Sequence, residues 1–155
     1  MIRGHLDGGT AAVAHAFWIT IRVSIQGVTG IRIPSDPIDF LIDTGSPWTM
    51  LHPMDASNYA GIKLPRLQNM RAQGWSDLVD RGGLGGHGAL FAVKPCRYTF
   101  LQEDGTELHI AGTIHIGEST AVSNTHPSLL GRDVLQHFTL SVTPGRDEVL
   151  LDYVS

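Results

Sequence analysis

Cysteine is almost missing from this chain, because Cys96 is the only one among 155 residues. A single cysteine excludes a disulfide within the chain and permits a reducing compartment. Cys96 also has no histidine placed in a pattern typical of a catalytic cysteine, so we interpret it as a packed structural thiol.

Long apolar runs and blocks of like charge are missing as well. Polar residues, Gly or Pro interrupt every apolar stretch well before the roughly 20 residues of a membrane-spanning helix. Near the N-terminus, His5, Asp7 and His15 break up the apolar core that a secretory signal needs. The net charge of −4 is spread out, so nothing predicts binding to nucleic acid or an anionic membrane. We expect a cytoplasmic protein without a membrane span.

Glycine and proline are abundant instead, with 18 and 8 residues, and 42% of the chain is hydrophobic. This composition is typical of an ordered protein with many turns between strands. We predict a flexible N-terminal segment over residues 1–13 and a single domain over residues 14–155. The expected fold class is mostly β, with one or two short helices.

The expected elements follow from local patterns. Apolar and polar residues alternate over residues 17–25 and 108–116, as in half-buried strands. Shorter apolar stretches predict further strands at 31–33, 38–43, 49–51, 89–93, 97–102, 139–143 and 148–153. Residues 53–61 begin with Pro and end with Gly, which predicts a short helix, and 133–138 predicts one or two helical turns. Residues 103–106 read as a hairpin turn.

The most informative segment is Phe40-Leu41-Ile42-Asp43-Thr44-Gly45-Ser46. It places an acid where an apolar strand ends and a tight turn begins, close to apolar walls that can perturb a pKa. Two more motifs follow it: the Gly-rich stretch at 82–88, and Leu129-Leu130-Gly131-Arg132-Asp133-Val134-Leu135.

In this order, the three motifs resemble those of the aspartic peptidases of the retroviral (retropepsin) type, from about residue 17 to residue 153. The resemblance implies a single-lobe acid-protease fold, in which a closed barrel-like lobe carries one or two short helices. It also implies an endopeptidase that uses a water activated by carboxylates, a polypeptide substrate, and no metal or other cofactor. Because two carboxylates must share one proton, a mildly acidic pH optimum is expected.

The resemblance assigns roles to individual residues. It makes Asp43 the catalytic acid and base, with Thr44 gripping the partner loop and Gly45 offering its carbonyl to the substrate backbone. The expected substrate-binding residues lie in the flap and in one side pocket: Gly83, Leu84, Gly85 and Leu129. The expected structural supports of the site are Ser46, Gly131 and Arg132.

Two positions depart from the viral pattern. Pro47 stands where many viral enzymes have an acid that meets the arginine, which leaves the partner of Arg132 open. Asp133 replaces the more common Asn.

The number of acids determines the expected assembly. No second Asp-Thr/Ser-Gly loop is present, because Asp7-Gly8-Gly9 and Asp104-Gly105-Thr106 read as turns. One lobe then supplies one acid, and an active site requires a two-fold homodimer with both copies of Asp43 at its centre. Residues 149–154, a terminal strand, are the expected dimer seam.

Other readings remain open. A catalytically inactive dimerisation or protein-binding module on the same fold is the main alternative, and a monomeric β-barrel ligand binder of another family is a third. Residues 83–88 also match Gly-x-Gly-x-x-Gly, but no helix long enough for a dinucleotide site follows. His109 and His115 share a predicted strand with no carboxylate or Cys set to complete a metal site.

Overall fold

The computed structural model describes residues 1–7, 16–75, 77–84, 87–121, 126–143, 145 and 148–154. For residues 6–7, 82–84 and 87–89 it describes the backbone only. The elements are β1 (Ile2–Asp7), β2 (Ala16–Ile25), β3 (Ile38–Ile42), β4 (Met50–Leu51), α1 (Pro53–Ala60), α2 (Leu67–Ala72), β5 (Leu78–Leu84), β6 (His87–Leu101), β7 (Glu107–Gly117), β8 (Leu129–Leu130), α3 (Arg132–Leu135), β9 (Phe138–Thr143) and β10 (Glu148–Tyr153).

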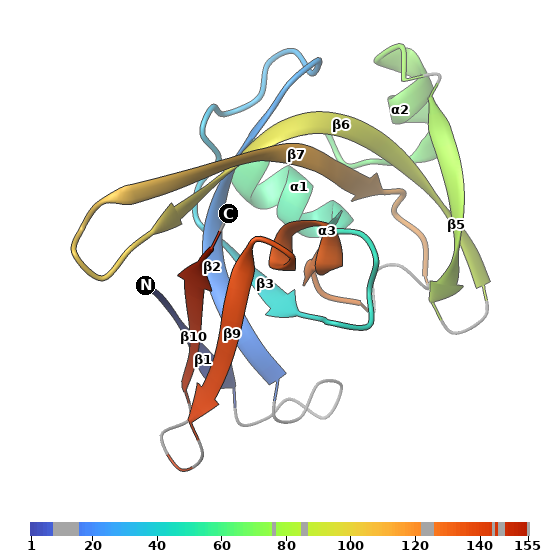
Figure 1. Cartoon of the computed structure of the whole chain (residues 1–155). Coiled ribbons are helices and arrows are strands. Elements are labelled where there is room, and N and C mark those ends of the chain that lie inside the picture. Colours follow the sequence, from blue (N-terminus) through green and yellow to red (C-terminus); the bar gives the residue numbers. More distant parts are fainter. Residues whose placement is uncertain are drawn as a thin grey trace.

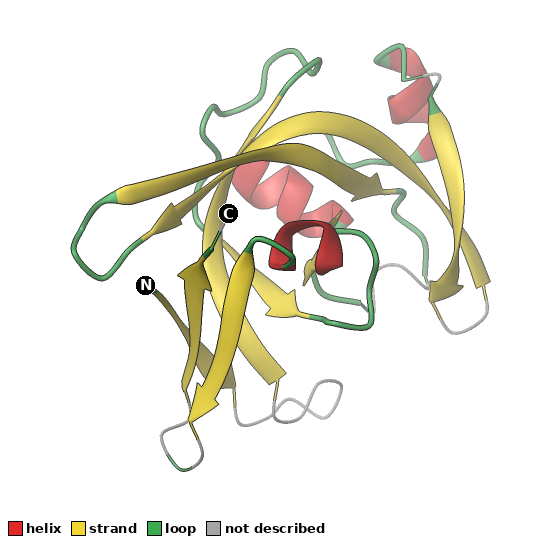
Figure 2. Ribbon diagram, in the orientation of Figure 1, coloured by secondary structure: helices red, strands yellow, loops and turns green. Residues whose placement is uncertain are grey.

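The fold is mostly β and contains a closed six-stranded barrel with few helices, as predicted for its class (Figures 1 and 2). The strands follow the order β6, β7, β4, β8, β3 and β2. The barrel closes where β2 pairs antiparallel with β6, from Arg22 opposite Thr99 to Ile25 opposite Cys96. Closure removes the unpaired edges that an open sheet of these strands would present.

Two extensions leave the barrel. Among the described strands, β5 pairs only with β6 and forms a long hairpin with it, and β1, β10 and β9 continue outward from β2 (Figure 1). β10 lies between β1 and β9, so both edges of the expected dimer seam at 149–154 are occupied by strands of the same chain. In the described part of the chain, β9 is paired on one side only, and Leu140 and Val142 are exposed on it.

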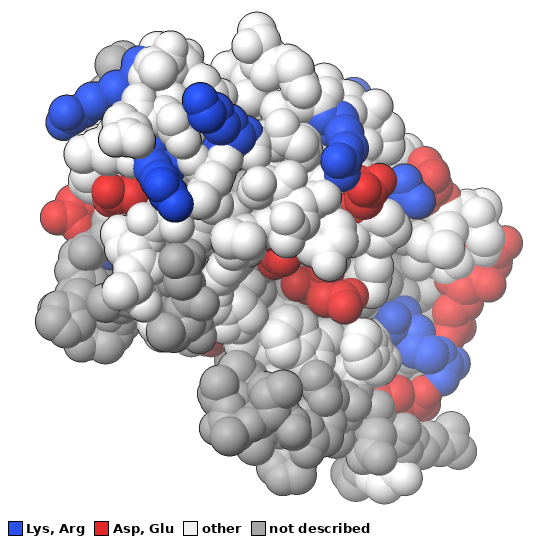
Figure 3. Space-filling model, turned by 180° about the vertical axis from the view of Figure 1, so that it is seen from behind, with Lys and Arg blue, Asp and Glu red and all other residues white. Residues whose placement is uncertain are grey.

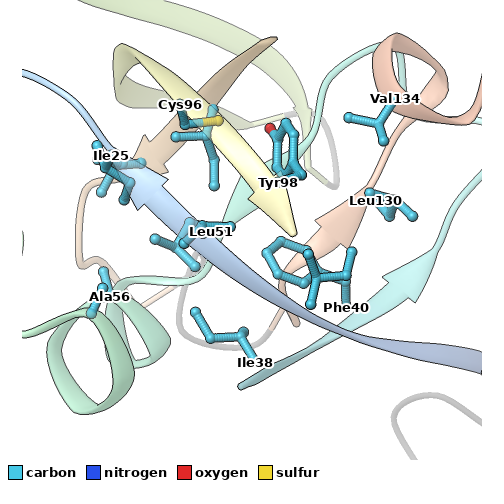
Figure 4. Packing of buried hydrophobic residues seen from close by; sticks show 14 of the residues in the cluster. Ile25, Ile38, Phe40, Leu51, Ala56, Cys96, Tyr98, Leu130 and Val134 are labelled. Atoms are coloured by element: carbon cyan, nitrogen blue, oxygen red, sulfur yellow. The ribbon is translucent and has the colours of Figure 1, made fainter. Parts of the chain in front are cut away.

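The core lies inside the barrel and comes from the apolar side of the alternating strands (Figure 4). Ile21 and Val23 of β2 are almost fully buried, whereas Arg22 between them is exposed, as the period-two pattern predicts. Cys96 is buried in the same cluster, as expected of a packed thiol. Burial raises the pKa of its thiol to about 12, which keeps it protonated and unreactive near neutral pH.

Helix α1 follows the sequence prediction closely. His52 caps its first turn by accepting a hydrogen bond from the Met54 N–H at its Nδ1, 3.0 Å away. Gly61 ends it in the left-handed conformation, with φ of 72°, and Ala56 and Ala60 are buried. Among the described residues, no helix has the length and apolar character needed to cross a bilayer.

Several segments differ from the predictions. Residues 2–7, within the segment expected to be flexible, form β1 because β2 and β10 pair with it on both sides, while residues 8–13 lie outside the described residues. Residues 31–33 form a loop, β6 is one continuous strand instead of two, and α2 was not predicted. On the face seen in Figure 3, basic and acidic side chains both occur, with uncharged residues between them.

Candidate functional site

Asp43 lies at the end of a pair of parallel strands in the barrel. β3 pairs in parallel with β8, with Leu41 opposite Leu129 and Ile42 opposite Leu130. The Asp43 N–H continues this ladder by donating to the Leu130 carbonyl, 3.0 Å away. The predicted catalytic loop and the second motif, far apart in sequence, are therefore neighbours in the fold.

The turn after Asp43 fixes one oxygen of its carboxylate. The Gly45 N–H donates to Asp43 Oδ1 at 2.9 Å, and the Ser46 N–H donates to the Asp43 carbonyl at 3.2 Å. A Cβ on Gly45 would lie 3.2 Å from Oδ1, so a larger residue would crowd the carboxylate. Asp43 is half-buried, and among the described residues Oδ2 has no hydrogen-bond partner. This oxygen is available to water, a substrate or a second carboxylate.

The two motifs are locked together through their backbones. The Arg132 N–H donates to the Ser46 carbonyl at 2.9 Å, and Ser46 Oγ donates to the Trp48 carbonyl at 2.7 Å. Gly131 packs so closely that a Cβ there would lie 2.3 Å from the Trp48 carbonyl oxygen and 2.9 Å from that of Ser46. Only glycine fits this contact, which explains why the second motif contains one.

A side-chain contact that the motifs did not predict fixes the same junction. Thr49 Oγ1 donates to Asp133 Oδ1 at 2.7 Å, and the Thr49 N–H donates to Oδ2 at 3.1 Å. Thr49 Oγ1 also accepts a hydrogen bond from the Gly131 N–H at 3.0 Å. The Thr49 side chain is fully buried, so these bonds satisfy polar groups that would otherwise be costly to bury.

Arg132 contacts the loop only through its backbone in the described structure. Its side chain is exposed and forms no ion pair or hydrogen bond with a described residue. The carboxylate of Asp133, one position further on, makes a side-chain contact to Thr49 instead. The presence of Asp133 where Asn is more common was the only sequence signal for this contact.

Leu129 lines a small hollow near the loop. The hollow measures about 20 Å³, and Met50 and Phe91 also line it. Leu129 is 7% exposed, and it pairs with both Leu41 and Met50. The residue predicted to form a side pocket therefore lies beside an apolar depression.

The predicted flap residues belong to the β5–β6 hairpin. Gly83 and Leu84 are the last two residues of β5, and Leu84 is opposite His87 of β6. Gly85 lies outside the described residues. In the described backbone, β5 and β6 pair antiparallel and extend away from the barrel (Figure 1).

An aromatic and cationic cluster connects this hairpin to the Asp43 loop. The Arg81 guanidinium of β5 lies over the Trp48 ring, 4.5 Å from its centroid. The Trp48 ring stacks on His115 of β7 at 5.2 Å, and the Phe91 ring meets His115 edge-on at 6.0 Å. The Trp48 carbonyl also accepts a hydrogen bond from Ser46 Oγ. Trp48 therefore links Arg81 of β5 to the loop that follows Asp43.

His115 is the buried titratable group of this cluster. It is 1% exposed, Arg81 Nε donates to its Nε2 at 3.4 Å, and its Nδ1 has no partner among the described residues. Burial, and then the positive charge of Arg81, lower its pKa below the usual 6.5, although Asp133 acts in the opposite direction. The neutral imidazole can accept from Arg81, and the protonated one cannot.

We therefore expect the chain to lose stability when pH falls below about 6.5. In that range the unfolded state binds a proton at His115 that the folded state resists, so the free energy of unfolding decreases with a slope of at most about 1.4 kcal/mol per pH unit. The measurement is urea unfolding across pH 5 to 8. His115→Gln should lower this slope, and the exposed control His5→Gln should not. Equal slopes in all three proteins would contradict the prediction.

Comparison with known proteins adds no family to this geometry, because no family model and no curated protein matches the chain. In the described part of the chain, no three His, Cys, Asp or Glu side chains gather in a way that could hold a metal ion. The site is therefore defined by its own atoms: a half-buried carboxylate on a tight turn, a distant segment that braces this turn, and Trp48, whose ring contacts Arg81 of β5.

Proposed function

We propose that this chain is an aspartic endopeptidase of the retropepsin type. The observation that carries the proposal is the geometry of the Asp43 loop. One carboxylate oxygen accepts a hydrogen bond from a backbone N–H, and the other has no partner among the described residues. Gly131 packs closely against the carbonyl groups of Ser46 and Trp48 in the same loop. A tight, braced turn of this kind holds a carboxylate in one orientation, as proton transfer to a substrate requires.

The proposed chemistry needs two such carboxylates. When two Asp43 side chains face each other, they share one proton, because both cannot ionise at close range. The ionised one removes a proton from a water molecule as this water attacks the scissile carbonyl. The protonated one donates to the carbonyl oxygen, which gives a tetrahedral gem-diol. As the C–N bond breaks, the proton taken from water passes to the leaving amine, and a gem-diol hydroxyl returns one proton to the carboxylate pair. Thr44 and Gly45 border this centre, and the hairpin with Gly83 and Leu84 would cover an extended peptide and add strand-like hydrogen bonds to it.

The chain supplies one such acid, so the proposed enzyme is a two-fold homodimer. The described surface offers a contact for a second copy at β9, which has a free edge. Leu140 and Val142 on this strand are 38% and 49% exposed. We place the seam there instead of on β10, because β10 is already paired on both sides.

Cleavage measured at several protein concentrations tests this proposal. Well below the dimer dissociation constant, the rate of hydrolysis of an unfolded protein substrate should rise with the square of the chain concentration, and above it linearly. The measurement is initial rate between pH 3 and 8, with and without a peptide analogue that carries a tetrahedral hydroxyl in place of the scissile carbonyl. The analogue should abolish cleavage.

Variants on β9 separate assembly from chemistry. Val142→Lys places a charge on the free edge and should shift the concentration curve to higher values, whereas the rate at saturating concentration stays unchanged. Ile33→Lys is the matched control, because Ile33 is 66% exposed on a loop away from β9. A strictly linear dependence at all concentrations, unchanged in Val142→Lys, would overturn the shared site.

A non-enzymatic dimerisation or protein-binding module is the second candidate. The exposed apolar side chains of β9 favour it as much as they favour the enzyme. If the chain is such a module, sedimentation should show a dimer that cleaves no substrate and does not bind the hydroxyl analogue. Sedimentation and cleavage measured on the same sample therefore distinguish the two candidates.

A further inference from the structure

A second hollow lies on the outer side of the barrel and shares no lining residue with the Asp43 site. It is a groove of about 500 Å³ formed by β2, β6, β7 and the loop before β3. Pockets for small molecules commonly measure about 300–1,000 Å³. Nothing in the peptidase proposal uses this groove.

Two arginines that have no anionic partner among the described residues line this groove. Arg22 is opposite Thr99, and Ser24 is opposite Arg97, so the arginines are diagonal neighbours on one face of the β2–β6 pair. Diagonal neighbours lie about 7–8 Å apart, within reach of long side chains. Both arginines are exposed, and neither forms an ion pair or hydrogen bond with any described residue.

One carboxylate, that of Glu107, also lines the groove, where its Oε2 lies 3.5 Å from Nε2 of His109, another lining residue. Nδ1 of His109 lies 3.0 Å from Thr99 Oγ1. Asp39, next to the groove, accepts a hydrogen bond from Thr20 Oγ1 at 2.6 Å. The groove lining thus holds two guanidinium groups and one carboxylate, with hydroxyl groups around them. The like charges of the two arginines repel each other unless an anion lies between them.

We propose that this groove binds a small organic anion. Arg22 and Arg97 would hold its carboxylate or phosphate group, because guanidinium groups match these oxyanions with paired hydrogen bonds. The lining also contains Pro34, Pro37 and the 65% exposed Leu101, which provide an apolar surface for the body of the ligand. The ligand class is therefore an acid with one oxyanion head and a compact hydrophobic body.

Titration of the ¹⁵N-labelled chain with benzoate, phenyl phosphate and neutral benzamide tests this proposal. Benzoate or phenyl phosphate should cause saturable shifts of the amide signals of Thr20, Ser24 and Thr99, and benzamide should not. The stronger of the two acids identifies the preferred head group. Inorganic phosphate should bind more weakly than phenyl phosphate, because it lacks the apolar body.

Variants of the two arginines complete the test. Arg22→Gln and Arg97→Gln should each weaken binding about tenfold or more, because each removes charge-assisted hydrogen bonds. Arg66→Gln is the matched control, with the same change of charge on an exposed residue outside the groove, and should bind as the unchanged chain does. Equal shifts with benzamide, equal weakening in Arg66→Gln, or no saturable shift with either acid would overturn the proposal. The titrations of the unchanged chain measure ligand binding directly. Their outcome therefore depends neither on how the variants fold nor on peptidase activity.

Discussion

Replacing Asp43 with Asn is expected to lower the rate of peptide hydrolysis by about 10⁴-fold, because it removes both proton-transferring carboxylates of a symmetric dimer at once. The fold should be unaffected, since the Asn Oδ1 can still accept from the Gly45 N–H as Asp43 Oδ1 does. The measurement is kcat on an unfolded protein substrate, together with the Tm of the variant. Asp36→Asn, an exposed acid paired with Arg32, is the matched control and should keep full activity.

Mixing the Asp43→Asn chain with the unchanged chain makes this test sharper. If each active site needs one Asp43 from both copies, an equal mixture forms mixed dimers with only one carboxylate. Activity should then fall to about half of that given by the same amount of unchanged chain alone. Unaltered activity in the mixture, or full activity of Asp43→Asn by itself, would refute the paired-carboxylate mechanism.

Replacing Gly131 with Ala should destabilise the fold by about 3 kcal/mol or more. The new Cβ would lie 2.3 Å from the Trp48 carbonyl oxygen and 2.5 Å from its carbonyl carbon. These are backbone atoms, so no side chain can rotate to make room. The loop from Ser46 to Trp48 has to move, and because the Ser46 N–H bonds to the Asp43 carbonyl we expect activity to fall along with stability.

Chemical denaturation and cleavage assays on the same preparation check this prediction. A loss of about 3 kcal/mol should lower the Tm by about 6 °C or more in a domain of this size. Gly112→Ala is the matched control, because its Cβ would meet only the Tyr98 ring at 3.4 Å. We expect the control to change stability far less. Similar stabilities for the two variants would contradict the close contact at Gly131.

Local patterns predicted most of the strands because each strand shows one face to the core. The alternation over 17–25 became β2, and the Pro and Gly at the two ends of 53–61 became the ends of α1. α2 was missed because it is short and because Arg66, the residue before it, makes no capping hydrogen bond with its side chain. Its sequence therefore carries little local signal.

Pro95 explains why β6 was predicted as two strands. Proline inside a strand normally costs a ladder hydrogen bond. Here the Pro95 carbonyl accepts from the Gln26 N–H at 2.9 Å, toward the end of β2. The N–H and C=O of one strand residue point to the same side, so the missing donor costs β6 no bond with β7. Whether a strand can contain a proline thus depends on which strand lies beside it, and the local sequence does not show this.

The candidate site likewise combines features that the local sequence predicts with tertiary contacts that it does not predict. The Asp43 turn was predicted from a short segment, because an acid between an apolar run and Thr-Gly is a local signal. Gly131 was expected only from the resemblance, because the contact that requires a glycine there is with the distant Trp48. The bond between Thr49 and Asp133 could not be predicted, because it joins residues 84 positions apart that have no common pattern. The contact of Arg81 with Trp48 likewise depends on where β5 crosses the loop.

The long reach of these contacts also bears on how the protein folds. The bonds that brace the Asp43 loop span 84 and 82 positions, from Thr49 to Asp133 and to Gly131. High contact order slows folding, because distant segments must meet before their interactions contribute. During synthesis, Asp43 emerges long before residues 129–133, so the loop has no brace until those residues have also left the ribosome. The braced orientation of the Asp43 carboxylate is therefore a late product of folding, whatever the order in which the strands form.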